Sequence, residues 1–329
     1  MSKAMVDRFG RIHTSLRIGV TDRCNLRCRY CMPEQVEFLP RAEILTFEEI
    51  ERVTRVAVRL GVDKARITGG EPLVRRDVSE LVARLAQIDG LDEIALTTNG
   101  LLLEEHAEEL KRAGLDRLNV SLDTVRPDVF RQWTRRDELA RVLRGLDAAL
   151  RAGFTRIRLN ALAIRGLTED EIVPLVEFAR DRRVEVRFIE FMPIDADRQW
   201  NEKAVLTGAE IRKRIEQKFG PLRSRSRPDP AQPAADFELA DGTRIGLICS
   251  VTEPFCEQCN RLRITAEGQL RNCLFSQQGW DLRSLLRSGA DDDALAEMMR
   301  ACVAAKKRGH GTDEPYMLRP DRAMYQIGG

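Results

Sequence analysis

The hydrophobic positions between Leu16 and Phe191 alternate between short continuous runs and longer amphipathic stretches. The short runs are rich in β-branched residues and predict six strands, at Leu16–Thr21, Ala65–Thr68, Glu93–Thr98, Arg117–Leu122, Arg156–Ala163 and Val184–Phe191. Between most of these strands, apolar residues recur with the 3.6-residue period of a helix. Strands that alternate with helices pair in parallel through right-handed crossovers. The pattern therefore predicts an α/β fold with six βα units.

The clearest helix is predicted over Phe47–Leu60, where one side of the helix is apolar. Thr46 and Glu49 stand three residues apart at its start, which is the spacing of a capping box. Thr168 and Glu171 repeat that spacing and predict a second capped helix after them.

Six βα units are too few for a closed eight-fold barrel, which typically needs about 250 residues. We therefore expect a partial (βα)6 barrel of the TIM type with one open side. A linker rich in Pro, Arg and Ser follows at Gly220–Pro233. We expect a barrel core over residues 1–222 and a smaller α+β domain over residues 223–329. In that second domain, Asp241–Gly242 and Glu267–Gly268 predict hairpin turns.

Composition and charge narrow the class of protein. The 329 residues are 43% hydrophobic, which argues against a disordered chain. Basic and acidic residues nearly cancel, 54 against 52, whereas binders of nucleic acid or membrane surfaces carry a one-sided surplus. The sequence contains no apolar run long enough to span a membrane and no segment typical of a signal peptide. We therefore expect a cytoplasmic protein that binds neither nucleic acid nor membranes.

The chain holds eight cysteines but only three histidines, which disfavours metal sites built from imidazole. Six cysteines form two groups, which we call the first triplet (Cys24, Cys28, Cys31) and the second triplet (Cys256, Cys259, Cys273). In a reducing compartment, clustered cysteines bind metals or act in catalysis more often than they form disulfides. Cys249 and Cys302 stand apart, and we interpret both as small buried hydrophobic residues. His310 is interpreted as a surface residue of a basic loop.

The first triplet directly follows the first predicted strand. In barrel enzymes, the loops at the carboxyl ends of the strands carry the active site. A structural zinc site closes on four protein ligands, whereas three cysteines without a local fourth ligand suit a [4Fe–4S] cluster with one open iron. Zinc with a distant fourth ligand is the alternative. For the second triplet, spacing does not decide between a cluster and a zinc site completed by Cys249.

Two motifs resemble the radical S-adenosylmethionine superfamily. The first triplet has the form Cys-x3-Cys-x2-Cys with Tyr30 before its last cysteine, and the next strand ends in Gly69-Gly70-Glu71-Pro72. The resemblance implies that S-adenosylmethionine chelates the open iron of a [4Fe–4S] cluster. It also implies that one electron from the cluster cleaves this molecule and leaves a 5′-deoxyadenosyl radical.

The whole chain is similar to the molybdenum cofactor biosynthesis protein A family, the GTP 3′,8-cyclases. The similarity covers FCEQCNRLRITAEGQLRNCLF, TGGEPLVRRD, LTTNG, NVSLD, RFIEFMP and the final Gly-Gly. It implies a second [4Fe–4S] cluster on the second triplet, with its open iron on the guanine of GTP. It further implies hydrogen abstraction from the ribose C3′ and attack of the carbon radical on guanine C8. The product is (8S)-3′,8-cyclo-7,8-dihydro-GTP, in the first step of molybdenum cofactor biosynthesis.

The resemblance also assigns roles to single positions. The residues implied in binding GTP are Arg17, Arg66, Thr97, Arg158, Arg261, Leu262 and Arg263. The residues implied in binding S-adenosylmethionine are Tyr30, Gly70, Ser121 and Met192, with Glu71 close to its amino group. Gly328 and Gly329 form a catalytic tail that reaches into the active site. Arg158 stands where family members commonly carry a lysine.

The resemblance implies several partners besides GTP and S-adenosylmethionine. These are an electron donor, a second copy of the chain in a homodimer, and the molybdopterin-precursor synthase that takes over the product. Two rival hypotheses are a peptide-modifying radical enzyme with auxiliary clusters and a zinc-stabilised binding module on a barrel scaffold. The first rival class usually has more cysteines near its carboxyl terminus than this chain has.

Overall fold

A computed structural model describes residues 4–198, 200–227, 229–309 and 320–328. Within them, one twelve-stranded sheet has the order β12-β11-β10-β1-β2-β3-β4-β5-β6-β9-β8-β7. Its strands are β1 Ser15–Gly19, β2 Lys64–Thr68, β3 Glu93–Thr98, β4 Arg117–Ser121, β5 Ile157–Ala163, β6 Glu185–Glu190, β7 Arg223–Ser224, β8 Ala235–Glu238, β9 Arg244–Ile248, β10 Arg261–Ile264, β11 Gln269–Arg271 and β12 Trp280–Asp281.

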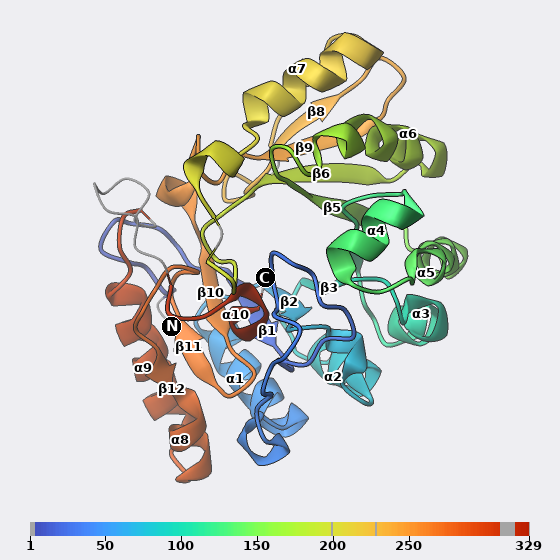
Figure 1. The fold of residues 1–329 in the computed structure, drawn as a ribbon. Helices are drawn as coiled ribbons and strands as arrows, with labels where there is room; N and C mark the ends of the chain where they lie inside the picture. Colours follow the sequence, from blue (N-terminus) through green and yellow to red (C-terminus); the bar gives the residue numbers. More distant parts are fainter. Residues whose placement is uncertain (1–3, 199, 228, 310–319, 329) are drawn as a thin grey trace.

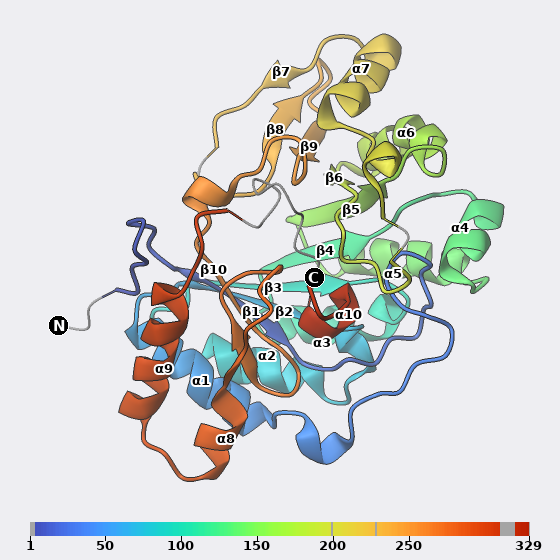
Figure 2. The ribbon, with the colours of Figure 1, turned by 60° about the vertical axis from the view of Figure 1, so that its left-hand side comes forward.

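Strands β1 to β6 confirm the six predicted strands. Each pairs in parallel with the next one along the chain. The sheet curves but does not close, because β10 lies against β1 and β9 against β6 instead of β1 meeting β6. The expected partial barrel is therefore confirmed, and the curved sheet is visible in Figures 1 and 2.

The helices cover the outer face of the sheet, and α8 and α9 extend that layer beside α1 (Figures 1 and 2). They are α1 Phe47–Arg59, α2 Val78–Ala86, α3 Leu103–Arg112, α4 Pro127–Thr134, α5 Leu139–Arg151, α6 Ile172–Arg182, α7 Gly208–Phe219, α8 Leu282–Arg287, α9 Asp292–Ala304 and α10 Met324–Ile327. Single 3-10 turns lie at η1 Arg41–Glu43, η2 Pro72–Val74, η3 Glu169–Glu171, η4 Glu202–Ala204 and η5 Cys256–Gln258. The short helix α10 is the exception to the outer layer, since it lies inside the curve of the sheet.

The capping box predicted before α1 is confirmed. The Thr46 hydroxyl accepts a hydrogen bond from the Glu49 amide at 3.2 Å, and the Glu49 carboxylate accepts one from the Thr46 amide at 2.7 Å. These bonds satisfy two of the amides that a helix start leaves without partners. The apolar side of α1, including Ile50, Val53 and Ala57, is buried against the sheet.

The capping box predicted at Thr168 and Glu171 is wrong. The Thr168 hydroxyl instead bonds to the backbone of Leu162 and Ile164, at 2.8 Å in each case. The Glu171 carboxylate accepts hydrogen bonds from the side chains of Thr124 and Arg126. Partners that are distant in sequence therefore use both side chains, and α6 begins after the turn η3.

The carboxyl-terminal third of the chain extends both edges of the barrel sheet. Asp241–Gly242 joins β8 to β9, and Glu267–Gly268 joins β10 to β11, so both predicted hairpins are confirmed. Strand β9 continues the sheet in parallel beyond β6, and β10 does the same beyond β1. The division into domains 1–222 and 223–329 stays a prediction, because one sheet runs through both.

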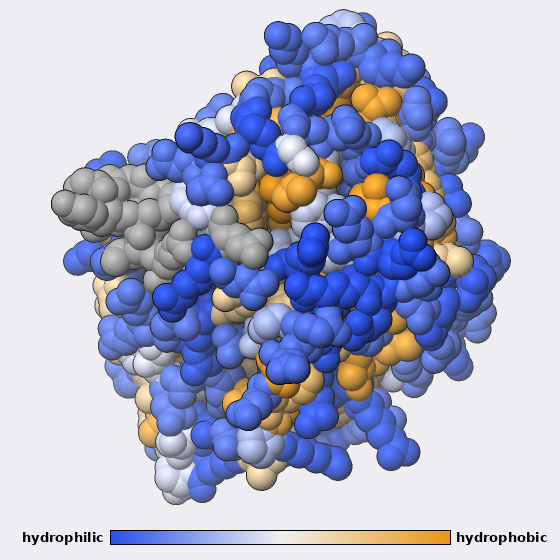
Figure 3. All heavy atoms as spheres, in the orientation of Figure 1, coloured by the Kyte–Doolittle hydropathy of each residue, from blue (hydrophilic) through white to orange (hydrophobic). Residues whose placement is uncertain are grey.

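The surface is mostly polar. Figure 3 shows one face on which hydrophilic residues dominate and apolar residues form small separate groups. Among the described helices, none has both the length and the apolar character needed to cross a membrane.

Candidate active site

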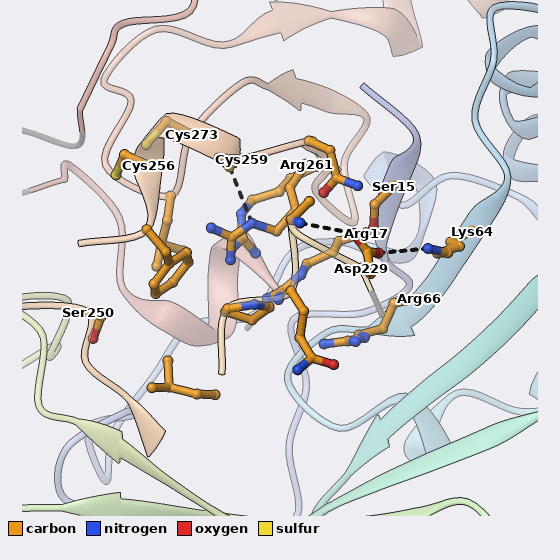
Figure 4. Close-up of a pocket in the computed structure, with 18 of the residues that line it drawn as sticks. Ser15, Arg17, Lys64, Arg66, Asp229, Ser250, Cys256, Cys259, Arg261 and Cys273 are labelled. Atoms are coloured by element: carbon orange, nitrogen blue, oxygen red, sulfur yellow. Dashed lines mark hydrogen bonds and ion pairs between the residues drawn. The ribbon is translucent and has the colours of Figure 1, made fainter. Parts of the chain in front are cut away.

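A cavity of about 490 Å³ lies on the inner face of the curved sheet. Figure 4 shows side chains from several strands that point into it. Among the described residues, its lining includes thirteen arginine and lysine side chains but only two carboxylates, from Glu93 and Asp229. The nearly neutral chain thus concentrates positive charge in one place, which favours an anionic ligand.

Three of these arginines stand side by side across neighbouring strands. Arg263 on β10 is in register with Arg17 on β1, and Arg17 is in register with Arg66 on β2. Residues in register on paired strands point to the same face of the sheet, so all three side chains enter the cavity. Leu262 stands between Arg261 and Arg263 and points to the opposite face, where its side chain is buried in the core. The structure therefore does not bring the Leu262 side chain to the cavity.

Burial and mutual repulsion destabilise the charged forms of the arginines in this row. Burial lowers the pKa of Arg17 well below its usual value, and the positive charges of Arg263 and Arg66 lower it further. Burial, Arg158 and Arg187 lower the pKa of Arg66 to about 10. The Nε atom of Arg17 is buried without a hydrogen-bond partner in the described part of the chain. A buried donor without a partner costs free energy, and a phosphate oxygen would remove that cost.

Arg158 lines the same cavity and is held by a carboxylate. Its Nε donates to Glu185 Oε2 at 3.1 Å, and Arg187 donates to the other oxygen of Glu185. Thr97 also lines the cavity and stands in one register row with Asn119 and Arg158. Glu185 therefore fixes two guanidinium groups beside each other.

Sequence reasoning missed several basic residues of the cavity. These are Lys64, Arg117, Arg156 and Arg187 on the strand side, with Arg11, Lys306, Lys307 and Arg308 near the second triplet. A partial signal was available, because Arg117 and Arg187 are charged residues within the predicted strands and Lys64 directly precedes one. The predicted linker also contributes to the lining through Asp229, which forms an ion pair with Lys64 at 2.7 Å.

All three cysteines of the second triplet line the cavity. Arg261 Nε donates to Cys259 Sγ at 3.3 Å, and the Phe275 amide donates to Cys273 Sγ at 3.5 Å. Burial acts to raise the pKa of the Cys259 thiol, but the positive charges of Arg261 and Lys306 outweigh it and lower the pKa to about 5. The three cysteines supply the soft sulfur donors that an iron–sulfur cluster requires.

The remaining two cysteines lie elsewhere. Cys302 is fully buried in the core, as expected. Cys249 is half-buried, and its sulfur packs against Gly208 at the start of α7, outside the cavity lining. In the part of the chain that the structure describes, no three Cys, His, Asp or Glu side chains gather closely enough to hold a single metal ion.

The first triplet lies in the loop after β1, at the carboxyl end of the strands. The Leu26 amide donates to Cys24 Sγ at 3.4 Å, and Asn99 Nδ2 donates to the same sulfur at 3.7 Å. Burial and negative neighbours raise the pKa of Cys24 to about 11 and that of Cys31 to about 12. The donor set again consists of three half-buried free thiols, which suits a cluster.

The residues expected around S-adenosylmethionine divide into two places. Gly70 packs tightly against the first-triplet loop, because an added Cβ would lie 2.4 Å from the Arg23 carbonyl oxygen. The Tyr30 hydroxyl donates to Asp123, which follows Ser121 at the end of β4. Met192 instead lines the basic cavity.

Glu71 connects two loops through hydrogen bonds of its carboxylate. Its carboxylate is buried and accepts hydrogen bonds from the Leu73 amide, the Thr98 hydroxyl and the Asn99 amide at 2.6–3.0 Å. Burial raises the pKa of Glu71 to about 7. These contacts fix the ends of β2 and β3 and use the carboxylate that was expected near the amino group of S-adenosylmethionine.

The carboxyl-terminal helix α10 connects the two cysteine sites. The backbone of Tyr325 hydrogen-bonds to Cys31 of the first triplet, and Met324 lines the basic cavity. The Gly328 carbonyl accepts a hydrogen bond from Arg263. Gly328 has φ +78°, and an added Cβ would lie 2.8 Å from Thr68 Cγ2. Gly329 lies outside the described residues, as does His310.

Comparisons with known proteins decide the family. Residues 18–179 match the Radical SAM superfamily, and residues 184–312 match Molybdenum Cofactor Synthesis C. A curated relative from Rhodopirellula baltica, named GTP 3′,8-cyclase, is 55% identical over 331 residues, which cover 99% of this chain and 92% of that protein. A mitochondrial GTP 3′,8-cyclase from Arabidopsis thaliana is 43% identical over 332 residues, covering 100% of this chain and 84% of the relative. The chain belongs to the GTP 3′,8-cyclase family.

Solved structures show the same fold at greater distance. SuiB of Streptococcus suis, bound to S-adenosylmethionine, has a TM-score of 0.61 and 18% identity, covering 89% of this chain and 69% of SuiB. SuiB has also been solved with a precursor peptide, with a TM-score of 0.62. This likeness extends to the fold alone. Membership of the GTP 3′,8-cyclase family establishes the radical S-adenosylmethionine chemistry with its [4Fe–4S] clusters, and it excludes the zinc-stabilised binding module.

Proposed function

We propose that this chain converts GTP to (8S)-3′,8-cyclo-7,8-dihydro-GTP in the first step of molybdenum cofactor biosynthesis. The observation that carries the proposal is a single cavity lined by both the second triplet and the row Arg263, Arg17 and Arg66. Soft thiol donors and a strip of buried guanidinium groups lie together in this cavity. A nucleoside triphosphate offers both a base and a polyanion, so it matches both parts.

The arginines would bind and orient the triphosphate. A guanidinium group donates two parallel hydrogen bonds to a phosphate, and Arg17 has a buried Nε without a partner among the described residues. Arg158 and Arg187 would bind the same triphosphate, because Glu185 holds their guanidinium groups next to each other at the cavity wall. The positive potential would draw the anion in, and the surrounding strands would keep its position fixed while the ribose reacts.

The second triplet would hold a cluster on the guanine side of GTP, and the first triplet would hold the cluster that binds S-adenosylmethionine. When bound, the first cluster and S-adenosylmethionine supply a 5′-deoxyadenosyl radical. Tyr30 lies within the first-triplet loop, Gly70 packs against that loop after β2, and Ser121 ends β4, so these residues would line the pocket of that molecule. Met192 and α10 lie towards the cavity and would exclude water between the two substrates.

Anaerobic turnover tests the proposal. The reconstituted chain is incubated with GTP, S-adenosylmethionine and a chemical reductant. We expect equal amounts of 5′-deoxyadenosine and cyclised GTP. A chain with a reducible first cluster that forms no cyclised nucleotide would refute the proposed reaction. A peptide-modifying activity would require peptide-dependent 5′-deoxyadenosine without any need for GTP.

We also propose that two copies of the chain associate through the amino-terminal hairpin. Val6 and Ile12 face each other across an antiparallel bridge, and their exposed fractions are 50% and 54%. Phe9 at the tip is 42% exposed. Large apolar side chains exposed together are typical of an association surface. Light scattering should give the mass of a dimer for the wild type and that of a monomer for Val6→Ser/Ile12→Ser. A dimeric double variant would contradict this surface.

The cytoplasmic location, the external electron donor and delivery of the product to the molybdopterin-precursor synthase stay predictions. Cell fractionation tests the first. The electron donor is tested by comparing the rate of turnover with reduced small redox proteins and with a chemical reductant. Delivery of the product is tested by adding the synthase and measuring how much of the product it takes over.

A further inference from the structure

Two buried cations of the cavity lining lie next to the second triplet, and the proposed chemistry gives neither of them a role. Arg11 comes from the amino-terminal hairpin and Lys306 from the segment that follows α9. Their exposed fractions are 7% and 3%. Buried charges are rare unless paired, because burial removes the water that stabilises them.

Lys306 links the two chain segments that carry Cys259 and Cys273. Its Nζ donates to the Arg261 carbonyl oxygen at 2.9 Å and to the Asn272 carbonyl oxygen at 2.6 Å. Arg261 follows Cys259 by two residues, and Asn272 directly precedes Cys273. One ammonium group therefore sets the separation of two ligand-bearing segments.

Arg11 fixes the third cysteine in the same way. Its Nη1 donates to the Cys256 carbonyl oxygen at 2.6 Å and to the Arg308 carbonyl oxygen at 2.9 Å, while Nη2 donates to the Lys307 carbonyl oxygen at 2.6 Å. Asp7 orients the guanidinium group, because Arg11 Nε donates to its carboxylate at 2.6 Å. The Lys306–Arg308 segment is thereby attached to all three cysteine segments.

The two cysteine sites differ in their electrostatic surroundings. Glu71 and Asp123 place negative charge near the first triplet, and the pKa values of its thiols are raised, with burial as the largest cause. Near the second triplet, Lys306 and Arg261 place positive charge beside the Cys259 thiol. Positive charge close to a cluster stabilises its reduced form relative to its oxidised form.

We propose that Arg11 and Lys306 are positioning residues of the second cluster: they hold its three cysteine segments at the required separation, and Lys306 raises its reduction potential. This inference rests on the proposed assignment of that cluster to Cys256, Cys259 and Cys273. Neither residue needs to touch GTP for this role, because both act through backbone carbonyl groups and through charge.

Iron content tests the positioning role. The wild type should bind about eight iron atoms per chain after anaerobic reconstitution, the number for two [4Fe–4S] clusters. Lys306→Met and Arg11→Met should bind about four and keep only the signal of the first cluster, and a chain in which the second triplet is changed to serine should do the same. The exposed residues Lys213 on α7 and Arg8 in the amino-terminal hairpin provide the controls, because Lys213→Met and Arg8→Met should retain about eight. Circular dichroism of the cluster-free chains verifies that the variants fold.

The midpoint potential tests the electrostatic role. Lys306→Gln keeps two N–H donors but loses the charge, whereas Lys306→Arg keeps the charge. The second cluster should become harder to reduce in Lys306→Gln and stay close to wild type in Lys306→Arg, while the first cluster is unchanged in both. If Lys306→Met does not fold, the comparison of Lys306→Gln with Lys306→Arg still tests whether the charge of Lys306 acts on the second cluster.

The outcomes distinguish the role of Arg11 and Lys306 from the assignment of a cluster to the second triplet. About eight iron atoms in both methionine variants, or equal potentials in the Gln and Arg variants, would overturn the inference. Only four iron atoms in the wild type would instead refute the assignment of a second cluster, whatever the variants do.

Discussion

At the scale of single residues, surroundings decide what each side chain can do. Arg17, Arg66 and Arg263 are ordinary strand residues by sequence, yet their register places three guanidinium groups in one cavity. Successive side chains of a strand point to opposite faces of the sheet, which explains why Leu262 points into the core between two arginines. The strand pattern of the sequence was sufficient to predict this orientation. Lys306 could not have been found in this way, because its partners Arg261 and Asn272 are far from it in sequence.

Arg158 supplies a prediction at this scale. Arg158→Ala should raise the KM for GTP by about 10-fold or more, because a charge-assisted hydrogen bond is worth about 1.5–3 kcal/mol. Arg158→Lys should stay within a few-fold of wild type, since it keeps the positive charge at this position. Steady-state kinetics with varied GTP provide the measurement. Arg151→Ala, an exposed position on α5, is the control. An unchanged KM in Arg158→Ala would remove Arg158 from the binding site.

His13 predicts a pH dependence of stability. It is fully buried, and burial followed by the charge of Lys306 lowers its pKa from 6.5 to about 4. The unfolded chain therefore takes up a proton at a higher pH than the folded chain. His13 therefore contributes a fall of on the order of 3 kcal/mol to the free energy of unfolding of the cluster-free protein as the pH drops from about 6.5 to 4. Glu71, with its raised pKa, acts in the opposite direction over this range, so the contribution of His13 is measured against a variant that lacks it.

The control for this dependence is a second histidine variant. The stability of the wild type relative to His13→Leu should fall by this amount between pH 6.5 and 4, whereas the difference between the wild type and His106→Gln on α3 should stay constant. Denaturant titrations at several pH values provide the measurement. A difference between the wild type and His13→Leu that stays constant over this range would show that His13 does not cause the dependence.

At the scale of elements, local patterns predicted the strands and failed where distant residues intervene. The six barrel strands and both hairpins follow from short apolar runs and Asp-Gly or Glu-Gly turns. A hairpin pattern specifies which two strands pair but not which edge they join, so the attachment of β9 to β6 was not predictable. Glu171 failed as a helix cap because Thr124 and Arg126 use its carboxylate.

The tail after α10 provides the prediction for elements. Gly328→Ala should lower product formation at least about 10-fold while both clusters remain, because the new Cβ would collide with Thr68 and α10 would shift. Gly289→Ala is the matched control, since Gly289 has φ +79° but no neighbouring atom within 4 Å. It should lose about 1 kcal/mol of stability and keep its activity. Deletion of residues 328 and 329 should abolish the product. Normal turnover by either tail variant would contradict a role for the tail.

At the scale of the whole molecule, the nearly neutral net charge does not reveal that the cavity is strongly basic. A net charge of +2 gives no indication of a triphosphate, yet thirteen basic side chains from the described part of the chain surround one cavity. The sequence located both triplets, but it did not predict that α10 lies between them with contacts to Cys31 and Arg263. This placement depends on the complete fold, because it joins the last residues of the chain to its first and tenth strands.

Deuterium transfer tests the central claim, that one cavity brings GTP to the radical generated at the first triplet. The chain is incubated anaerobically with GTP deuterated at the ribose C3′, S-adenosylmethionine and a reductant, and mass spectrometry measures deuterium in the 5′-deoxyadenosine. We predict one deuterium per molecule in the wild type, and loss of GTP-dependent transfer when the cysteines of the second triplet are replaced by serine. 5′-Deoxyadenosine without deuterium in the wild type, formed during active turnover, would contradict the account.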